Sequence, residues 1–135
     1  MARKKKEEEE IKPYTLAPAS VPQQEFLLSS SDITLYSGSA GAGKTFAIIL
    51  NMVKFMLKEN STIVCFRRTS TQIRSNGGVW QEACMVFKKM FGDAVVIRHR
   101  DLEIYMPSTN STLKFAHLQY EADVLNHLGA QYSVK

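Results

Sequence analysis

The feature that most constrains this chain is the glycine-rich stretch at 35–49, which reads LYSGSAGAGKTFAII. Residues 38–45 match the P-loop pattern G-x-x-x-x-G-K-[ST] at every fixed position. The run DITLYS at 32–37 is expected to be a short strand. After the glycines, apolar residues recur at helical spacing from Lys44 to about Lys58. A strand, a tight glycine loop and a helix N-terminus, in that order, predict a cradle for the phosphates of a nucleotide.

Each residue type in this loop has a physical reason. The glycines allow sharp turns that point successive backbone N–H groups at phosphate oxygens. Lys44 places a positive charge near the β and γ phosphates, and the hydroxyl of Thr45 can ligate Mg²⁺. The predicted phosphate-binding residues are Gly38, Ser39, Ala40, Gly41, Ala42, Gly43, Lys44 and Thr45.

Two glutamines upstream are candidates for contacting the base. The sequence contains no Asn-Lys-x-Asp motif for reading guanine, whereas Gln23 and Gln24 precede the glycine loop by about fifteen residues. A glutamine amide donates and accepts hydrogen bonds at once, which matches the N7 and N6 edge of adenine. On spacing alone the alternative stays open that either glutamine is an ordinary surface residue.

The upstream half of the sequence predicts an arm followed by an α/β domain. Residues 1–20 contain the charge block RKKKEEEE and then a proline-rich stretch, so we expect a flexible arm. The domain occupies 21–135 and begins with a short helix over 22–30, with Phe26 and Leu27 facing inward. An apolar, β-branched run at 62–66 is typical of a strand buried in a parallel sheet, so a strand, helix, strand unit is predicted.

The downstream half predicts a helix, a meander and a second helix. One helical face over 79–91 carries the apolar side chains. The stretch 94–118 alternates as strands do and contains the turn PSTNS, which indicates a meander. EADVLNHL at 121–128 reads as a short helix stopped by Gly129. The predicted face of the first helix consists of Val79, Ala83, Val86, Phe87 and Met90.

Composition and charge narrow the class of protein. No apolar run reaches the eighteen or so residues of a membrane helix, and no apolar segment follows the N-terminal charges as in a signal peptide. Cys65 and Cys84 lack metal-ligand spacing, so we expect buried thiols in a reducing cytosol. The net charge is +4, and 67–100 holds seven Lys and Arg residues against two acidic ones. Such a stretch suits phosphates of a nucleotide or DNA, or a plain solvated surface.

Taken together, these residues resemble the N-terminal ATPase domain of phage terminase large subunits, the DNA-packaging motors. The resemblance covers everything past the charged arm. The FRRT segment and the LGAQYSV ending narrow the choice beyond what the P-loop alone allows. The matching motifs are PQQEFL at 22–27, LYSGSAGAGKT at 35–45, VCFRRTSTQIRSNGGVW at 64–80 and HLGAQYSV at 127–134.

The resemblance implies a P-loop NTPase fold of the ASCE (RecA-like) type, a three-layer α/β sandwich with a mainly parallel sheet. It implies an enzyme that hydrolyses ATP with Mg²⁺ to drive double-stranded DNA into a procapsid. The implied setting is a homo-oligomeric ring in the host cytoplasm, with a small terminase subunit and a portal protein as partners. A C-terminal nuclease domain is implied in the full-length protein.

Site residues carry over position by position. Gln23, with Gln24 beside it, matches the adenine-contacting glutamine, and 38–45 matches Walker A. Some terminases carry a basic residue early in the P-loop, where this chain has serine and alanine. Arg67 and Arg68, together with Arg74, match the region that supplies a phosphate-sensing or trans-acting arginine. Solvation of a strand end or contact with DNA are the alternatives for these arginines. The implied catalytic residues are Lys44, Thr45, Arg67 and Arg68.

The sequence departs from the family pattern at its last residues. In the family, the run beginning YSV continues into a strand that ends in an Asp-Glu pair, whereas here Val134 is followed by Lys135. Glu121 and Asp123 fall on a helix before that strand and are not expected to replace the pair. We therefore expect the 135-residue chain alone to hydrolyse ATP negligibly. The alternative functions are another ASCE ATPase, PhoH-like or helicase-type, and a non-catalytic module that binds nucleotide or DNA.

Overall fold

The structure is a computed structural model that describes residues 17–38 and 43–133. Most of the arm predicted at 1–20 therefore lies outside the described residues. The helices are α1 (Val21–Leu28), α2 (Lys44–Met56), α3 (Ser70–Arg74), α4 (Val79–Phe91) and α5 (Glu121–Leu125), with a 3-10 turn at Gly92–Ala94. The strands are β1 (Thr62–Arg67), β2 (Val96–Arg98), β3 (Glu103–Met106) and β4 (Ser111–His117).

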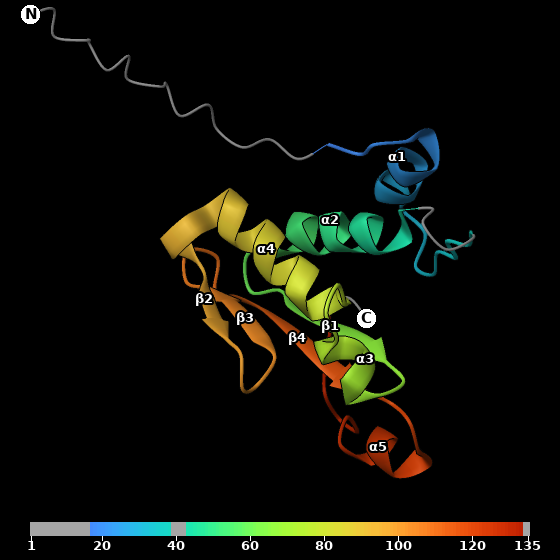
Figure 1. Cartoon of the computed structure of the whole chain (residues 1–135), viewed down its shortest axis with the longest axis vertical. Helices are drawn as coiled ribbons and strands as arrows, with labels where there is room; N and C mark the ends of the chain where they lie inside the picture. The colour runs from blue at the N-terminus through green and yellow to red at the C-terminus, as the bar shows by residue number, and fades with distance from the viewer. Residues whose placement is uncertain (1–16, 39–42, 134–135) are drawn as a thin grey trace, which may run out of the picture.

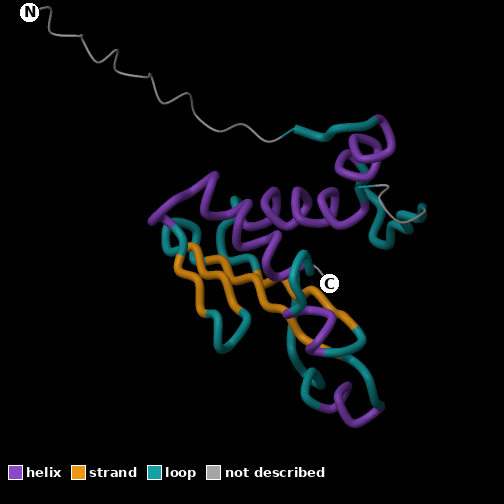
Figure 2. The backbone as a smooth tube through the Cα atoms, in the orientation of Figure 1, coloured by secondary structure: helices purple, strands orange, loops and turns teal. Residues whose placement is uncertain are grey.

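The four strands form one mixed sheet in the order β1-β4-β3-β2 (Figure 2). β1 and β4 are parallel, with Cys65 opposite Phe115, whereas β2, β3 and β4 are antiparallel neighbours. The predicted meander is confirmed. The prediction of a mainly parallel sheet is wrong for the described strands, because the short turns of a meander can join only antiparallel strands.

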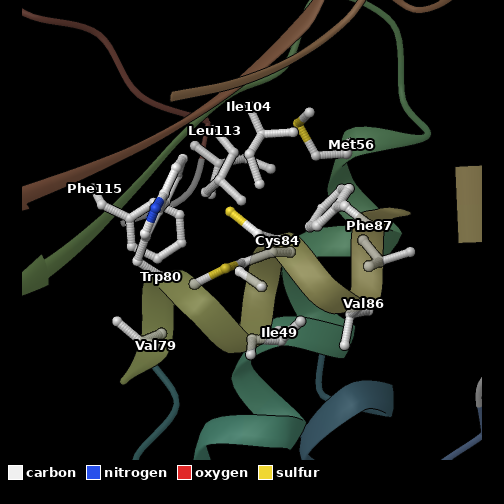
Figure 3. Close-up of a cluster of buried hydrophobic side chains, with 14 of the residues drawn as sticks. Ile49, Met56, Val79, Trp80, Cys84, Val86, Phe87, Ile104, Leu113 and Phe115 are labelled. Carbon is white, nitrogen blue, oxygen red and sulfur yellow. The ribbon is translucent and has the colours of Figure 1, made fainter. Parts of the chain in front are cut away.

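One face of the sheet is covered by α2 and α4 (Figure 1). Helical spacing places most apolar side chains of both helices on the sheet side, with Ile48 and Met85 as exposed exceptions. The predicted face of α4 is buried apart from the partly buried Met90. Figure 3 shows Trp80 of α4 against Phe115 of β4, and their ring centroids lie 5.3 Å apart. Ile104 and Leu113 extend this core toward Met56 of α2.

The opposite face of the sheet is more polar. Glu103 of β3 pairs with Arg98 of β2, and its second oxygen lies 3.8 Å from the Lys114 ammonium. The segment after α5 covers part of β1, where the His127 ring contacts Phe66 edge-on at 4.9 Å. The described residues therefore form two layers, helices on a sheet, and a third layer of the predicted sandwich is not among them.

The segment preceding the glycine loop is not a strand, so this prediction is wrong and the strand, helix, strand unit is not formed. Residues 31–38 form a loop in which Ile33 is 90% exposed and Leu35 is 92% exposed. A strand needs a neighbour to pair its backbone groups, and β1 pairs with β4 instead. Side-chain contacts to α1 hold the loop, with Ser29 Oγ 3.0 Å from Thr34 Oγ1 and Phe26 against Tyr36.

The end of α2 is fixed by hydroxyl groups from the start of β4. Ser111 is fully buried, and its Oγ donates to the Lys58 carbonyl at 2.6 Å and accepts from the Ser61 N–H at 3.2 Å. The Thr109 hydroxyl donates to the Met56 carbonyl at 2.8 Å. Carbonyls at a helix C-terminus lack partners within the helix, so these contacts anchor α2 on the sheet. In the ranges the structure describes, none of the helices is long and apolar enough to span a bilayer.

Candidate functional site

The glycine loop leads directly into α2, and its two described ends show how it is held. Residues 39–42, with the predicted ligands Ser39, Ala40, Gly41 and Ala42, lie outside the described residues. Gly43 has φ of +75°, in the left-handed region that favours glycine, and has no side chain to cap the helix. The first N–H groups of α2 therefore have no side-chain acceptor from this residue, which suits a bound anion.

Lys44 reaches across the loop. Its ammonium donates to the carbonyl of Gly38, at the other end of the glycine stretch. An ammonium has three N–H donors, so this contact leaves others for a phosphate. Thr45, the predicted Mg²⁺ ligand, follows in the first turn of α2 and is half-buried.

Gln23 is the one buried residue of α1, and its amide is engaged at both ends. Its Nε2 donates to the Gly43 carbonyl at 3.0 Å, and its Oε1 accepts from the Ala19 N–H at 2.6 Å. The side chain is 3% exposed. The neighbouring Gln24 is exposed, so the two candidate glutamines differ sharply in their surroundings. Phe26 and Leu27, expected to face inward, are half-buried.

Contacts between α1 and α2 support this arrangement. Besides the Gln23 contact, the Lys54 ammonium donates to the Leu27 carbonyl at 2.8 Å, near the end of α1. These two hydrogen bonds join α1 to both the first and the last turns of α2. The helix before the loop is thus fastened to the helix after it, although the loop between them is long.

The three candidate arginines fall into two groups. Arg67 and Arg68 are exposed at the C-terminal end of β1, and no hydrogen bond or ion pair joins their side chains to another described residue. Arg74 has a structural role, because its guanidinium donates hydrogen bonds to the carbonyls of His99 at 3.3 Å and Arg100 at 3.0 Å. It ties α3 to the turn between β2 and β3. Sequence reasoning did not separate these roles, since a backbone acceptor carries no sequence signal.

Of the two carboxylates before the C-terminal segment, Asp123 serves local structure. Asp123 Oδ2 accepts from the N–H groups of Gln119 at 2.9 Å and Tyr120 at 3.0 Å, which holds the start of α5. These hydrogen bonds lower the pKa of Asp123, and the nearby His117 and His127 add to the effect. Glu121 is exposed. That neither of them replaces an Asp-Glu pair stays a prediction.

The two cysteines have the character of packed thiols. Cys84 is buried in the core and Cys65 is half-buried on β1. Burial raises the pKa of each from 9.0 to about 11, against the opposing charges of Arg67 near Cys65 and Lys88 near Cys84. Among the described residues, no group of three or more His, Cys, Asp or Glu side chains is arranged to hold a metal ion.

Fold and site together define a mixed α/β protein in which a glycine-rich loop opens a helix packed on the sheet. The sequence profile of the family described as terminase large subunit, T4likevirus-type, N-terminal, matches residues 35–133. Because this match covers most of the chain, the protein belongs to that family, and the resemblance read from the motifs is confirmed. No curated protein and no solved structure matches the chain.

The extent of the match bears on the candidate residues. It includes the whole glycine loop together with Arg67 and Arg68. It begins at Leu35, so Gln23 and Gln24 lie outside it. Membership makes the chain part of a phage DNA-packaging protein, while the roles of individual residues rest on their geometry.

Proposed function

We propose that this chain binds ATP with Mg²⁺ through residues 38–45, as the nucleotide-binding part of a phage DNA-packaging ATPase. The observation that carries the proposal is a complete P-loop pattern at the N-terminus of α2, within the range matched by the terminase family. The residues fit the group, because Gly43 holds a glycine-favouring conformation and leaves the start of α2 free of a side-chain cap.

The residues of the loop have separate roles in this proposal. Backbone N–H groups at the start of α2 bind the phosphate oxygens, and Lys44 adds a positive charge beside them. Thr45 supplies a hydroxyl ligand for Mg²⁺, which when bound neutralises phosphate charge. Of the two candidate glutamines, Gln24 is the one proposed to contact the adenine, because Gln23 already has both ends of its amide engaged.

The exposed Arg67 and Arg68 are proposed to stabilise charge on the transferred phosphoryl group, within their own subunit or in a neighbour. In the full-length protein we propose ATP hydrolysis coupled to translocation of double-stranded DNA. The small terminase subunit and the portal protein are the proposed partners, with a homo-oligomeric ring in the host cytoplasm as the setting. For the 135-residue chain alone we propose binding with negligible hydrolysis.

Isothermal titration of the chain with Mg-ATP tests the binding proposal. The Lys44→Ala change is expected to weaken binding by roughly tenfold or more, because one charge-assisted contact to a phosphate contributes about 1.5–3 kcal/mol. Lys88→Ala is the matched control, since it removes the same charge from the exposed side of α4. Equal affinities for the wild type and Lys44→Ala would contradict the proposal. Robust hydrolysis that depends on Lys44 would contradict only the claim of negligible turnover.

A further inference from the structure

We propose that Gln23 is a positioning residue for the phosphate-binding loop, which it holds through the backbone of Gly43. The inference rests on the proposed function, because it assigns how Gly43 and the start of α2, at the end of the same loop, are positioned. It differs from a base-reading role, in which the glutamine would contact adenine. The two roles differ in what they predict for ligands that have phosphates but no base. Changing a positioning residue should weaken their binding, whereas changing a base contact should not.

The contact falls on the atom at which loop becomes helix. The Gly43 carbonyl accepts the first hydrogen bond of α2, from the Ala47 N–H at 3.0 Å, and it also accepts from Gln23 Nε2 at 3.0 Å. The position of this carbonyl sets the direction of the free N–H groups that follow it in α2. Gln23 therefore acts on the part of the loop that would face a phosphate, without touching the phosphate itself.

The other end of the amide is also fixed. Gln23 Oε1 accepts from the Ala19 N–H at 2.6 Å, so the side chain bridges the start of α1 and the start of α2. Ser20 caps α1, and its hydroxyl accepts from the Gln23 N–H at 3.4 Å. Held at both ends and 3% exposed, this amide has little freedom to swing toward a base.

Steric fit at Gly43 supports the same role. A Cβ atom added at Gly43 would clash with Gln23 Nε2, so the end of the glutamine side chain would have to move away from the loop. Position 43 thus favours glycine for two reasons, its φ of +75° and the close approach of the glutamine.

The test compares three ligands, Mg-tripolyphosphate, Mg-ATP and Mg-GTP, by isothermal titration of the 135-residue chain. Gln23→Ala removes the side chain, and Gln23→Met keeps its length but cannot donate to Gly43. Leu28→Ala, at an exposed position of the same helix, is the matched control. All titrations are run well below the unfolding temperature of each variant, so that lost stability alone does not change the affinity.

The proposal predicts that both Gln23 variants weaken Mg-tripolyphosphate and Mg-ATP by the same factor, about 5- to 30-fold, the equivalent of losing one buried hydrogen bond. The preference for ATP over GTP should stay unchanged, and Leu28→Ala should behave as wild type. Weaker ATP binding with unchanged tripolyphosphate binding would overturn the proposal in favour of base reading. Wild-type affinity in Gln23→Met would overturn it in favour of packing alone.

Two further outcomes keep the inference separable from the proposed function. If the wild-type chain binds neither phosphate ligand, or binds equally well with Lys44→Ala, the proposed function itself fails. If the Gln23 variants do not fold, side-chain amide exchange in the wild type decides the matter. The Gln23 NH₂ protons should exchange with solvent more slowly than those of Gln24, and equal rates would overturn the proposal.

Discussion

At the residue scale, the candidate loop could be found from the sequence pattern, but the contacts that hold its end could not. Gly43 and Lys44 follow from a local pattern in which each residue type has a chemical reason. The bond from Gln23 to the Gly43 carbonyl joins residues 20 positions apart in the sequence, and its acceptor is a backbone atom. A pattern of side-chain types contains no signal for such a partner. For the same reason the structural role of Arg74 could not be predicted from sequence, because its two acceptors are also backbone carbonyls.

The cysteines give a prediction about pH at this scale. With a pKa of about 11, Cys65 and Cys84 carry very little thiolate at pH 8. Native chain should therefore react with iodoacetamide roughly 100-fold more slowly than the chain unfolded in urea, where thiols have their ordinary acidity. Mass spectrometry of the labelled chain measures both rates. Equal rates in the two states would contradict the burial of these thiols.

The sign of the associated stability effect follows from the direction of the shift. Folding raises both thiol pKa values above the ordinary 9.0, so the folded state holds these protons more tightly than the unfolded state. The stabilising contribution is complete below about pH 9 and is lost as the pH rises toward 11. Urea unfolding at pH 8 and pH 10 should show a lower unfolding free energy at pH 10, beyond any loss seen in a Cys65→Ala, Cys84→Ala double variant.

At the element scale, local periodicity predicted what local contacts determine. The helices beginning at Lys44 and Val79 and the meander of β2, β3 and β4 are confirmed, because their spacing and turns lie within each segment. The strand expected at 32–37 is wrong, since strand formation depends on a partner elsewhere in the chain. β1 takes β4 as its neighbour, with Thr62 opposite Thr112. Neither strand's own sequence predicts which strand it pairs with.

The anchor at the end of α2 gives a stability prediction for this scale. Ser111→Ala should lower the unfolding free energy by about 1–3 kcal/mol, because it leaves the buried Ser61 N–H without a partner and removes the donor to the Lys58 carbonyl. Ser108→Ala, in the exposed turn just before it, is the control and should change stability by less than about 0.5 kcal/mol. Urea denaturation measures both. A Ser111→Ala chain as stable as the control would show that water replaces the lost contacts.

At the scale of the whole molecule, the described residues combine one sheet, one layer of helices and the ends of one loop. The core under α2 and α4 fixes the direction of α2, and α1 is fastened to both ends of that helix. The N-terminus of α2 thus has a fixed position relative to the sheet, which a phosphate site requires. Family membership was predictable because its motifs lie in the chain itself. The two-layer arrangement was not, because the resemblance implied a sandwich with a mainly parallel sheet.

We propose above all that a nucleoside triphosphate binds at the start of α2. Backbone amide NMR of the ¹⁵N-labelled chain during titration with Mg-ATP tests it most directly. The largest saturable chemical-shift changes should fall on the amides of residues 38–46. Lys44→Ala should abolish these changes at the same ligand concentrations. Shifts concentrated on β1 and the Arg67 end of the sheet, or no saturable shifts in the wild-type chain, would contradict it.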